Sequence, residues 1–186
     1  MHDRWGECDA ILLRCLLVTT AEKLAIAIDH PGIADGVELH RIAAESQVLD
    51  VNTRYAYLLW CRDFADTSVV ARRGDNVVGF VTGYRRPERP EVLFVWQVAV
   101  DAAARGGGVA GRMLDELIAR VPGATAMETT VTDDNAASRA LFAAFAARHG
   151  AEVERTELFG SEALGSQHEP EILHRISPID RGMVQK

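Results

Sequence analysis

Short apolar runs alternate along this chain with longer segments in which apolar residues recur every three or four positions. The short runs, rich in β-branched residues, predict strands at residues 23–29, 67–73, 77–85, 92–101, 126–133, 151–159 and 170–177. The longer segments have helical spacing and predict helices at residues 33–46, 53–66, 109–121 and 134–150. Strands and helices in this order, with no internal repeat or linker, predict one α/β domain with a mixed sheet.

Local signals place the boundaries of several elements. The run 92–101, VLFVWQVAVD, is almost continuously apolar, which predicts a central strand of the sheet. The charged stretch 85–91 before it, RRPERPE, contains two prolines and predicts a loop. Asn52 is placed to cap the second helix, and Asn135 is placed to cap the last helix, which Gly150 closes.

The length of the chain sets its domain organisation. With 186 residues it is large enough to bury a core as one domain, which we assign to residues 23–180. Residues 1–22 fit none of the pattern that follows, and we expect an N-terminal extension that is disordered or loosely docked. Its apolar stretch is interrupted by Arg14 and follows residues without net positive charge. Neither a signal peptide nor a membrane span is therefore predicted.

Charge and cysteine content narrow the class of partner. The formal net charge of −7 argues against a nucleic-acid-binding protein, which needs a basic surface to displace counterions. It suits a cationic or amine substrate, although a mildly acidic balance is also common among cytosolic proteins. Cys8, Cys15 and Cys61 form no C-x-x-C pair, so neither a metal site nor a disulfide framework is encoded. We expect reduced thiols and a cytoplasmic location.

The segment 98–114, VAVDAAARGGGVAGRML, joins the central strand to a helix through three consecutive glycines. Gly106, Gly108 and Gly111 spell G-x-G-x-x-G, the dinucleotide-binding fingerprint, and Asp133 stands where that motif has its acidic residue. Against this interpretation, intervening residues separate the strand from the glycines, and only one such unit is present. No Lys-Ser/Thr pair follows, which argues against a P-loop. A plain flexible turn is the structural alternative.

Arg105, Gly108 and Ala110 spell a second pattern, R-x-x-G-x-A, at the start of the helix. This pattern and the order of elements resemble the GCN5-related N-acetyltransferase (GNAT) superfamily. The resemblance implies the GNAT fold, a mixed and mostly antiparallel sheet of about seven strands flanked by about four helices, with acetyl-CoA as co-substrate and no metal. Backbone N–H groups at the positive end of the helix would bind the pyrophosphate. The cofactor-binding residues that it implies are Val98, Val100, Arg105, Gly106, Gly107, Gly108, Val109, Ala110, Gly111, Arg112 and Asn135.

Longer strings resemble one branch of that superfamily, the L-2,4-diaminobutyrate acetyltransferases of ectoine biosynthesis. They are LDVNTRYAYLLWCRDFADTSVVA, LFVWQVAVD, ETTVTDDNAASRALF and HEPEILHRI, and together they span roughly residues 48–176. The resemblance implies transfer of acetyl from acetyl-CoA to the γ-amine of L-2,4-diaminobutyrate, with N4-acetyl-L-2,4-diaminobutyrate as product. It also implies a homodimer that acts on a small diamine, without nucleic-acid or membrane partners.

The sequence departs from the superfamily where many members have a catalytic glutamate and tyrosine. The central strand carries Trp96 and Gln97 with no carboxylate, and Phe142 stands where a tyrosine often acts as an acid. Neither role transfers to this chain, although the amine must still lose a proton to a base or a water relay. The candidates for substrate binding and catalysis are Asp50, Trp96, Glu128, Asn135 and Glu169.

Each candidate also has a structural interpretation. Asp50 is a ligand of a substrate ammonium group or a turn residue, and Trp96 is a wall of the amine pocket or part of the core. Glu128 would be unusual as a buried strand acid without a partner, so a base or an ammonium anchor is the functional interpretation. Asn135 is a helix cap, a contact to the cofactor, or both. Glu169 closes the pocket or is an exposed edge charge.

Two questions stay open at the level of the sequence. The ligand of the substrate's α-carboxylate is one of Arg54, Arg62 and Arg85, since arginine suits a bidentate contact, while Tyr55 and Tyr57 flank the same helix. The activity has alternatives too. An acetyltransferase for another small amine or polyamine, or a non-catalytic acyl-CoA-binding module, fits the same cofactor motif.

Overall fold

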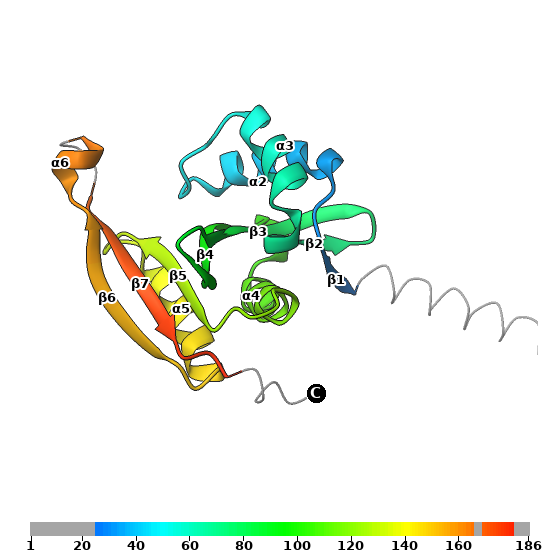
Figure 1. Cartoon of the computed structure of the whole chain (residues 1–186). Helices are drawn as coiled ribbons and strands as arrows, with labels where there is room; N and C mark the ends of the chain where they lie inside the picture. The colour runs from blue at the N-terminus through cyan, green and yellow to red at the C-terminus, as the bar shows by residue number, and fades with distance from the viewer. Residues whose placement is uncertain (1–24, 166–168, 181–186) are drawn as a thin grey trace, which may run out of the picture.

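Seven strands form a single sheet in the residues that the structure, a computed structural model, describes: 25–165 and 169–180 (Figure 1). They are β1 (Ile26–Asp29), β2 (Val69–Arg73), β3 (Asn76–Arg86), β4 (Arg89–Val100), β5 (Ala126–Val131), β6 (Glu152–Phe159) and β7 (Glu171–Ser177). Their order in the sheet is β1-β2-β3-β4-β5-β7-β6. Neighbours are antiparallel except β4 and β5, which are parallel. The predicted mixed, mostly antiparallel sheet is confirmed, with β4 as its central strand.

Helices cover both faces of this sheet (Figure 1). One face carries α2 (Gly36–Ser46) and α3 (Arg54–Asp63), and the other carries α4 (Val109–Arg120) and α5 (Ala136–Arg148). Short elements join them, namely α6 (Ser161–Leu164) and the 3-10 turns η1 (Ile33–Asp35), η2 (Ala65–Thr67) and η3 (Ala102–Ala104). Among the helices of the described ranges, none is long and apolar enough to cross a membrane.

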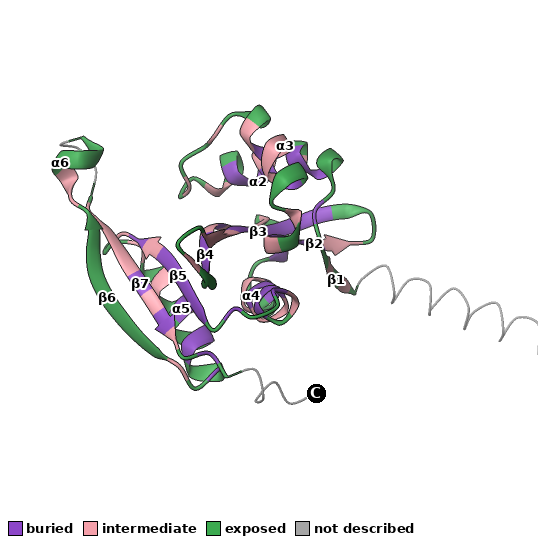
Figure 2. Ribbon diagram, viewed as in Figure 1, coloured by how far each residue is buried: buried purple, intermediate pink, exposed green. Residues whose placement is uncertain are grey.

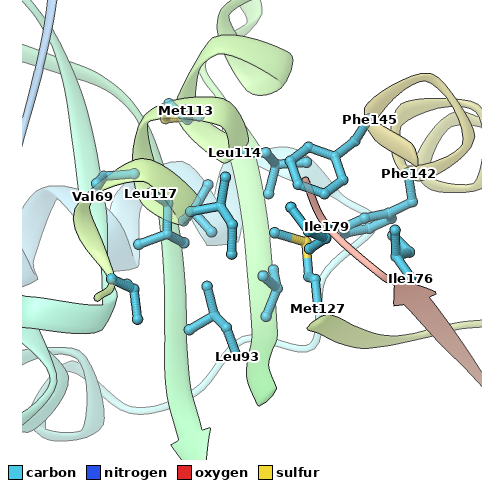
Figure 3. Packing of buried hydrophobic residues seen from close by; sticks show 14 of the residues in the cluster. Val69, Leu93, Met113, Leu114, Leu117, Met127, Phe142, Phe145, Ile176 and Ile179 are labelled. Carbon is cyan, nitrogen blue, oxygen red and sulfur yellow. The ribbon is translucent and has the colours of Figure 1, made fainter. Parts of the chain in front are cut away.

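The two faces have separate hydrophobic cores because consecutive residues of a strand point to opposite faces. In β2, Val69 and Ala71 pack into the core beneath α4 and α5, whereas Val70 packs into the core beneath α2 and α3. Figure 3 shows the first core, whose labelled members include Leu93, Met113, Leu117, Met127, Phe145 and Ile176. The strand pattern of the sequence thus sets which helix each side chain meets.

Apolar residues on one side of α4 fix the helix against the sheet. Val109, Met113 and Leu117 are four residues apart and buried, and Leu114 and Ile118 lie beside them. This spacing places all five on one face of a helix. Full burial of such a side chain contributes roughly 1.5–3 kcal/mol. The N-terminus of α4, which carries the glycine segment, is therefore firmly placed.

The prediction of a loop at residues 85–91 is wrong. β3 and β4 extend into this stretch from both sides, and only Pro87 and Glu88 form the turn between them. Pro90 lies inside β4, next to a shift in the β3–β4 register. Because pairing is irregular there, the missing N–H of proline removes no regular ladder hydrogen bond.

Helix caps are predicted to within one residue. The residue that caps α3 is Thr53 and not Asn52, because the Thr53 hydroxyl accepts a hydrogen bond of 3.2 Å from the N–H of Ala56. Asn135 caps α5, as predicted, and its side-chain oxygen accepts a 3.0 Å hydrogen bond from the N–H of Ser138. Both caps satisfy N–H groups that a helix leaves free in its first turn.

Strand β6 forms an edge of the sheet and is exposed along its whole length. Every residue of the strand is exposed, in contrast to β5, whose residues are mostly buried (Figure 2). Val153, Leu158 and Phe159 are large apolar residues on this exposed strand. An exposed strand edge presents unpaired backbone groups, to which another chain can bind.

Some predictions fall partly outside the described residues. The extension at residues 1–22 lies outside them, as do Cys8 and Cys15, and the domain boundaries 23–180 stay a prediction. Cys61 is a free, buried cysteine of α3. Burial, with a smaller contribution from Asp35, raises the pKa of its thiol to about 11, so the thiol is protonated at neutral pH.

Candidate active site

β4 and β5 separate after a short stretch of pairing. Parallel pairing joins Val92–Phe94 to Ala126–Glu128, and within these two strands, all of whose residues are described, no further pair follows. On the other side of β4, the register shifts between Thr82 and Gly83, which leaves Trp96 as a bulged residue. A bulge bends its strand and increases the local twist. Beyond this point, the backbone of β4 has no partner strand on the side that faces β5.

A cavity of about 320 Å³ lies at the end of β4 and the N-terminus of α4. Gly106 and Gly108 line it with positive φ angles of 81° and 68°, a conformation that favours glycine. A Cβ atom at either position would meet no protein atom within 4 Å. Gly108 is the N-cap of α4, and no side chain caps the first turn. The backbone N–H groups of the first turn of α4 are therefore left without a side-chain cap beside the cavity, and they form a site suited to phosphate oxygens.

The structure brings most of the predicted cofactor-binding residues to this cavity. Those that line it are Val98, Val100, Arg105, Gly106, Gly108, Val109, Ala110 and Gly111. Gly107 and Arg112 are not among its lining residues, and the guanidinium of Arg112 donates a 3.0 Å hydrogen bond to the carbonyl of Ile26 in β1. Asn135 lies at a second cavity, described below.

The connection between β4 and the glycines is ordered and contains the 3-10 turn η3. The Asp101 carboxylate accepts a 3.0 Å hydrogen bond from the N–H of Ala103 in η3 and pairs with Arg41 at 3.1 Å. The Ala103 hydrogen bond, followed by Arg41, holds the pKa of Asp101 below its ordinary value. Because η3 stands between strand and glycines, and the sheet has one parallel pair in its described strands, the dinucleotide-binding interpretation does not fit.

A second cavity, of about 460 Å³, opens where β4 and β5 separate. Four of the five predicted substrate and catalytic residues line it: Asp50, Trp96, Asn135 and Glu169. Its other lining residues are Val48, Leu49, Asn52, Gln97, Thr130, Val131, Thr132, Asp134 and Glu171. Four of these thirteen side chains are carboxylates, and in the described part of the chain none is basic. Such a cavity favours a cationic ligand.

The two cavities adjoin along the chain. Gln97 lines the second cavity and Val98 lines the first. Likewise, the α5 N-cap Asn135 lines the second, and Ala137 in the first turn of α5 lines the first. β4 and the start of α5 therefore contribute lining residues to both cavities.

The ring of Trp96 packs against a second tryptophan, Trp60. Its ring stacks on that of Trp60 in α3, with centroids 4.2 Å apart and an interplanar angle of 24°. Trp60 is in turn 4.8 Å from the ring of Phe64. Stacked aromatic pairs add stability beyond the apolar area that they bury. Trp96 thus packs against Trp60 and is also a lining residue of the second cavity, whereas its contact with an amine stays a prediction.

Glu128 does not line either cavity. Its side chain is 0% exposed, and its two oxygens lie 2.7 Å from Arg86, 2.8 Å from Arg89 and 2.7 Å from Arg175. Burial alone would raise the pKa of Glu128, but the hydrogen bonds from Arg175 and Arg86 and the charge of Arg89 outweigh it and lower the pKa. The predicted base or ammonium anchor is thus a partnered structural carboxylate, because three arginines occupy its oxygens.

None of the three arginines considered for the α-carboxylate lines the acidic cavity. Arg62 pairs with Asp63 at 2.7 Å, and Arg85 donates to the backbone carbonyls of Pro90 in β4 and of Pro122 in the α4–β5 connection. Tyr55 is 69% exposed, whereas Tyr57 is buried and donates a hydrogen bond to Gln97. Sequence reasoning missed Gln97, although a polar residue within an almost continuously apolar strand is the available signal.

Fold and site together define a class of α/β protein. Its members hold a phosphate-bearing cofactor at a glycine-rich helix N-terminus, beside a cavity for a second, cationic ligand. Residues 36–146 match the sequence model of the Acetyltransferase (GNAT) family. The chain therefore belongs to the acetyltransferase (GNAT) family. In the described ranges, no group of three or more histidine, cysteine, aspartate or glutamate side chains is arranged to hold a metal ion.

Several similar proteins are named diaminobutyrate acetyltransferases. The chain is 55% identical to the L-2,4-diaminobutyric acid acetyltransferase of Streptomyces avermitilis, over 83% of this chain and 89% of that protein. It is 52% identical to the protein of the same name from Streptomyces coelicolor, over 88% and 99%. Among solved structures, the diaminobutyrate acetyltransferase EctA from Paenibacillus lautus, in complex with its substrate and coenzyme A, is 34% identical with a TM-score of 0.80, covering 83% of this chain and 96% of that chain.

Proposed function

We propose that this protein transfers the acetyl group of acetyl-CoA to the γ-amine of L-2,4-diaminobutyrate, giving N4-acetyl-L-2,4-diaminobutyrate. The observation that carries the proposal is the acidic cavity beside the glycine-lined helix N-terminus. The names and the identity of its relatives support the same substrate. The product is the precursor that the resemblance assigns to ectoine biosynthesis.

The residues at the α4 N-terminus fit coenzyme A. Glycines at positions 106 and 108 leave open space where any other residue would place a side chain, and the free N–H groups of the first turn match a pyrophosphate. Arg105 adds a positive charge at the same cavity. The bound co-substrate supplies an activated acetyl thioester. The edge of β4 that faces β5 is unpaired near Val98, and it is placed to hydrogen-bond the pantetheine arm and to orient the carbonyl.

The acidic cavity is suited to a diamine. Asp50, Glu169 and Glu171 offer carboxylates to the two ammonium groups, and the face of Trp96 offers a cation–π contact. The attacking amine must lose a proton before it can react. We assign the acceptor of that proton to a carboxylate of this cavity, directly or through water, and not to Glu128. Asn135 both caps α5 and faces the reacting groups.

A turnover assay with a panel of amines tests the proposal. Thiol release from acetyl-CoA should be fastest with L-2,4-diaminobutyrate, and NMR of the product should place the acetyl group on the γ-nitrogen. Preference for spermidine or another polyamine would contradict the proposed substrate. Binding of coenzyme A by calorimetry, without thiol release from any amine, would instead identify a non-catalytic acyl-CoA-binding module.

We further propose that the protein is a cytoplasmic homodimer, as its resemblance to the diaminobutyrate branch implies. The exposed edge strand β6 and its apolar residues support a second copy as a partner. Light scattering of the purified protein tests this part of the proposal, and a monomer at micromolar concentration would contradict it.

A further inference from the structure

The side chain of Gln97 connects two elements that build the acidic cavity. Gln97 belongs to β4, directly after the bulged Trp96, and is only 5% exposed. Its Oε1 accepts a 3.0 Å hydrogen bond from the Tyr57 hydroxyl of α3. Its Nε2 donates a 2.9 Å hydrogen bond to the backbone carbonyl of Asp50. One buried amide thus joins the central strand to α3 and to the segment 47–53 between α2 and α3.

The chemistry of the three groups fixes the direction of both hydrogen bonds. The carbonyl of Asp50 can only accept, so the NH₂ group of Gln97 must face it. The amide oxygen then faces Tyr57, whose hydroxyl must donate. Burial raises the pKa of this hydroxyl, so it is protonated and able to donate at neutral pH.

Besides the Gln97 hydrogen bond, the segment that carries Asp50 is held by packing of Leu49 against the core beneath α2 and α3 and by hydrogen bonds between Asn52 and the Tyr57 hydroxyl. Residues 47–53 form no helix or strand, and within the segment Asn52 donates a long, 3.4 Å hydrogen bond to the same Asp50 carbonyl. Ser46 accepts hydrogen bonds of 3.3 Å from the N–H groups of Val48 and Leu49. The hydrogen bonds of Ser46 and of the Asp50 carbonyl to Asn52 lie within the segment or reach the last residue of α2, whereas the Gln97 hydrogen bond ties the segment to the sheet.

We propose that Gln97 is a positioning residue, which holds the Asp50 segment against β4 so that the Asp50 carboxylate faces the amine. Gln97 stands beside Trp96 on the strand where many members of the superfamily have a catalytic glutamate. A neutral amide does not accept a proton at neutral pH, so the role of Gln97 is positioning and not proton transfer. This inference rests on the proposed function for the identity of the amine.

Gln97→Glu tests the inference with almost no change of shape. The carboxylate can still accept from Tyr57, but its second oxygen meets the Asp50 carbonyl without a proton between them. Loss of a buried hydrogen bond, with an unsatisfied acceptor left behind, should raise the KM for diaminobutyrate about tenfold or more. The KM for acetyl-CoA should stay unchanged, and kcat should change less than about threefold. Tyr57→Phe should shift the same KM in the same direction by a smaller factor.

The pH profile separates positioning from proton transfer. If kcat of Gln97→Glu increased and its pH profile gained a new acidic ionisation, the side chain would act at the reacting nitrogen, and the inference would be overturned. An unchanged KM for diaminobutyrate would overturn it as well. Val92→Ala, a buried change at the far end of β4, is the matched control: it should lower Tm without raising this KM.

A readout without turnover keeps the test independent of the proposed function. In the ligand-free protein, amide hydrogen exchange of residues 47–53 should be about tenfold faster in Gln97→Glu than in wild type, because the segment loses its tie to the sheet. Exchange elsewhere in β4 should not change by this factor. Faster exchange without activity of the wild type towards diaminobutyrate would leave the positioning role intact and refute the substrate instead.

Discussion

Gly108 combines two requirements at one position. Its φ of 68° is unfavourable for any residue with a Cβ, and its missing side chain opens the cavity at the α4 N-terminus. Gly108→Val should therefore weaken coenzyme A binding about tenfold or more, since it adds backbone strain and fills the cavity. Isothermal titration calorimetry measures this change directly.

Gly123 supplies the matched control for that variant. Its φ is 74° and a Cβ there would also meet no atom within 4 Å, but it lies after α4 and lines neither cavity. Gly123→Val should cost similar stability and leave the affinity for coenzyme A unchanged. Equal losses of affinity in both variants would argue against a phosphate site at Gly108.

Asp50 is the residue on which recognition of the amine is expected to depend. Asp50→Asn keeps the size of the side chain and removes its charge, so the KM for diaminobutyrate should rise about tenfold while coenzyme A affinity stays the same. Asp66→Asn, an exposed residue outside both cavities, should leave both quantities unchanged. An Asp50→Asn enzyme with normal KM would remove Asp50 from the substrate site.

Individual residues also show how much of the candidate site could be predicted from the sequence. Asp50, Trp96, Asn135 and Glu169 were predicted from strings that resemble a family, and they line one cavity. Glu128 lines neither cavity, and its partners could not be read from the neighbouring sequence, because the three arginines lie 39 to 47 residues away in the chain. A buried acid and its counter-charges meet only after the sheet has formed.

At the scale of elements, the packing of β5 against its neighbouring strands involves the buried charge of Glu128. Glu128 of this strand is surrounded by arginines from β3, β4 and β7. Glu128→Gln leaves three half-buried guanidinium groups, whose side chains are 29%, 41% and 28% exposed, without their counter-charge. Because solvent screens these charges in part, the free energy of unfolding at pH 7 should fall by about 1–3 kcal/mol. Urea unfolding measures this cost, and kcat of the folded fraction should be retained because Glu128 lines neither cavity.

The pH dependence of that cost has a defined sign. The folded-state pKa of Glu128 lies below its ordinary value of 4.5, so the carboxylate contributes stability above this pH and loses the contribution as pH falls through the folded-state pKa. The difference in stability between wild type and Glu128→Gln should therefore be largest at neutral pH and shrink below about pH 4.5. A difference that stayed constant down to pH 3 would contradict the ionic role.

Strands and helices were predictable wherever a periodic pattern extends over several residues, and their ends were not. The strands at 92–101 and 126–133 correspond to β4 and β5, but the stretch 85–91 continues two strands despite its prolines. The reason is tertiary: an irregular register accepts Pro90, and composition alone does not report the register. Composition also does not reveal where β4 and β5 cease to pair, and both cavities depend on this separation.

At the scale of the whole molecule, charge should act on the encounter with substrate. The chain has a net charge of −7, and four carboxylates line the described part of the second cavity. Diaminobutyrate is a net cation at neutral pH, so kcat/KM for it should fall severalfold as the screening length shrinks from roughly 10 Å at 0.1 M salt to 3 Å at 1 M. Initial rates in sodium chloride measure the effect.

A neutral osmolyte at equal osmolality is the control for that experiment. It changes water activity without screening charge, so kcat/KM for diaminobutyrate should not fall with it as it falls with salt. Salt-independent kcat/KM would show that the acidic cavity recognises its ligand by contact alone, without long-range attraction.

The short pairing of β4 with β5 has a consequence for the protein in the cell. The central strand pairs with β3 along its length but with β5 only at Val92–Phe94, so half of its β5-facing edge is unpaired. On the proposed function, a small molecule occupies this unpaired edge. Ligand that binds only the folded chain stabilises it in proportion to the logarithm of ligand concentration. The supply of acetyl-CoA would then set not only the rate of this reaction but also how long each copy of the protein survives unfolding and degradation.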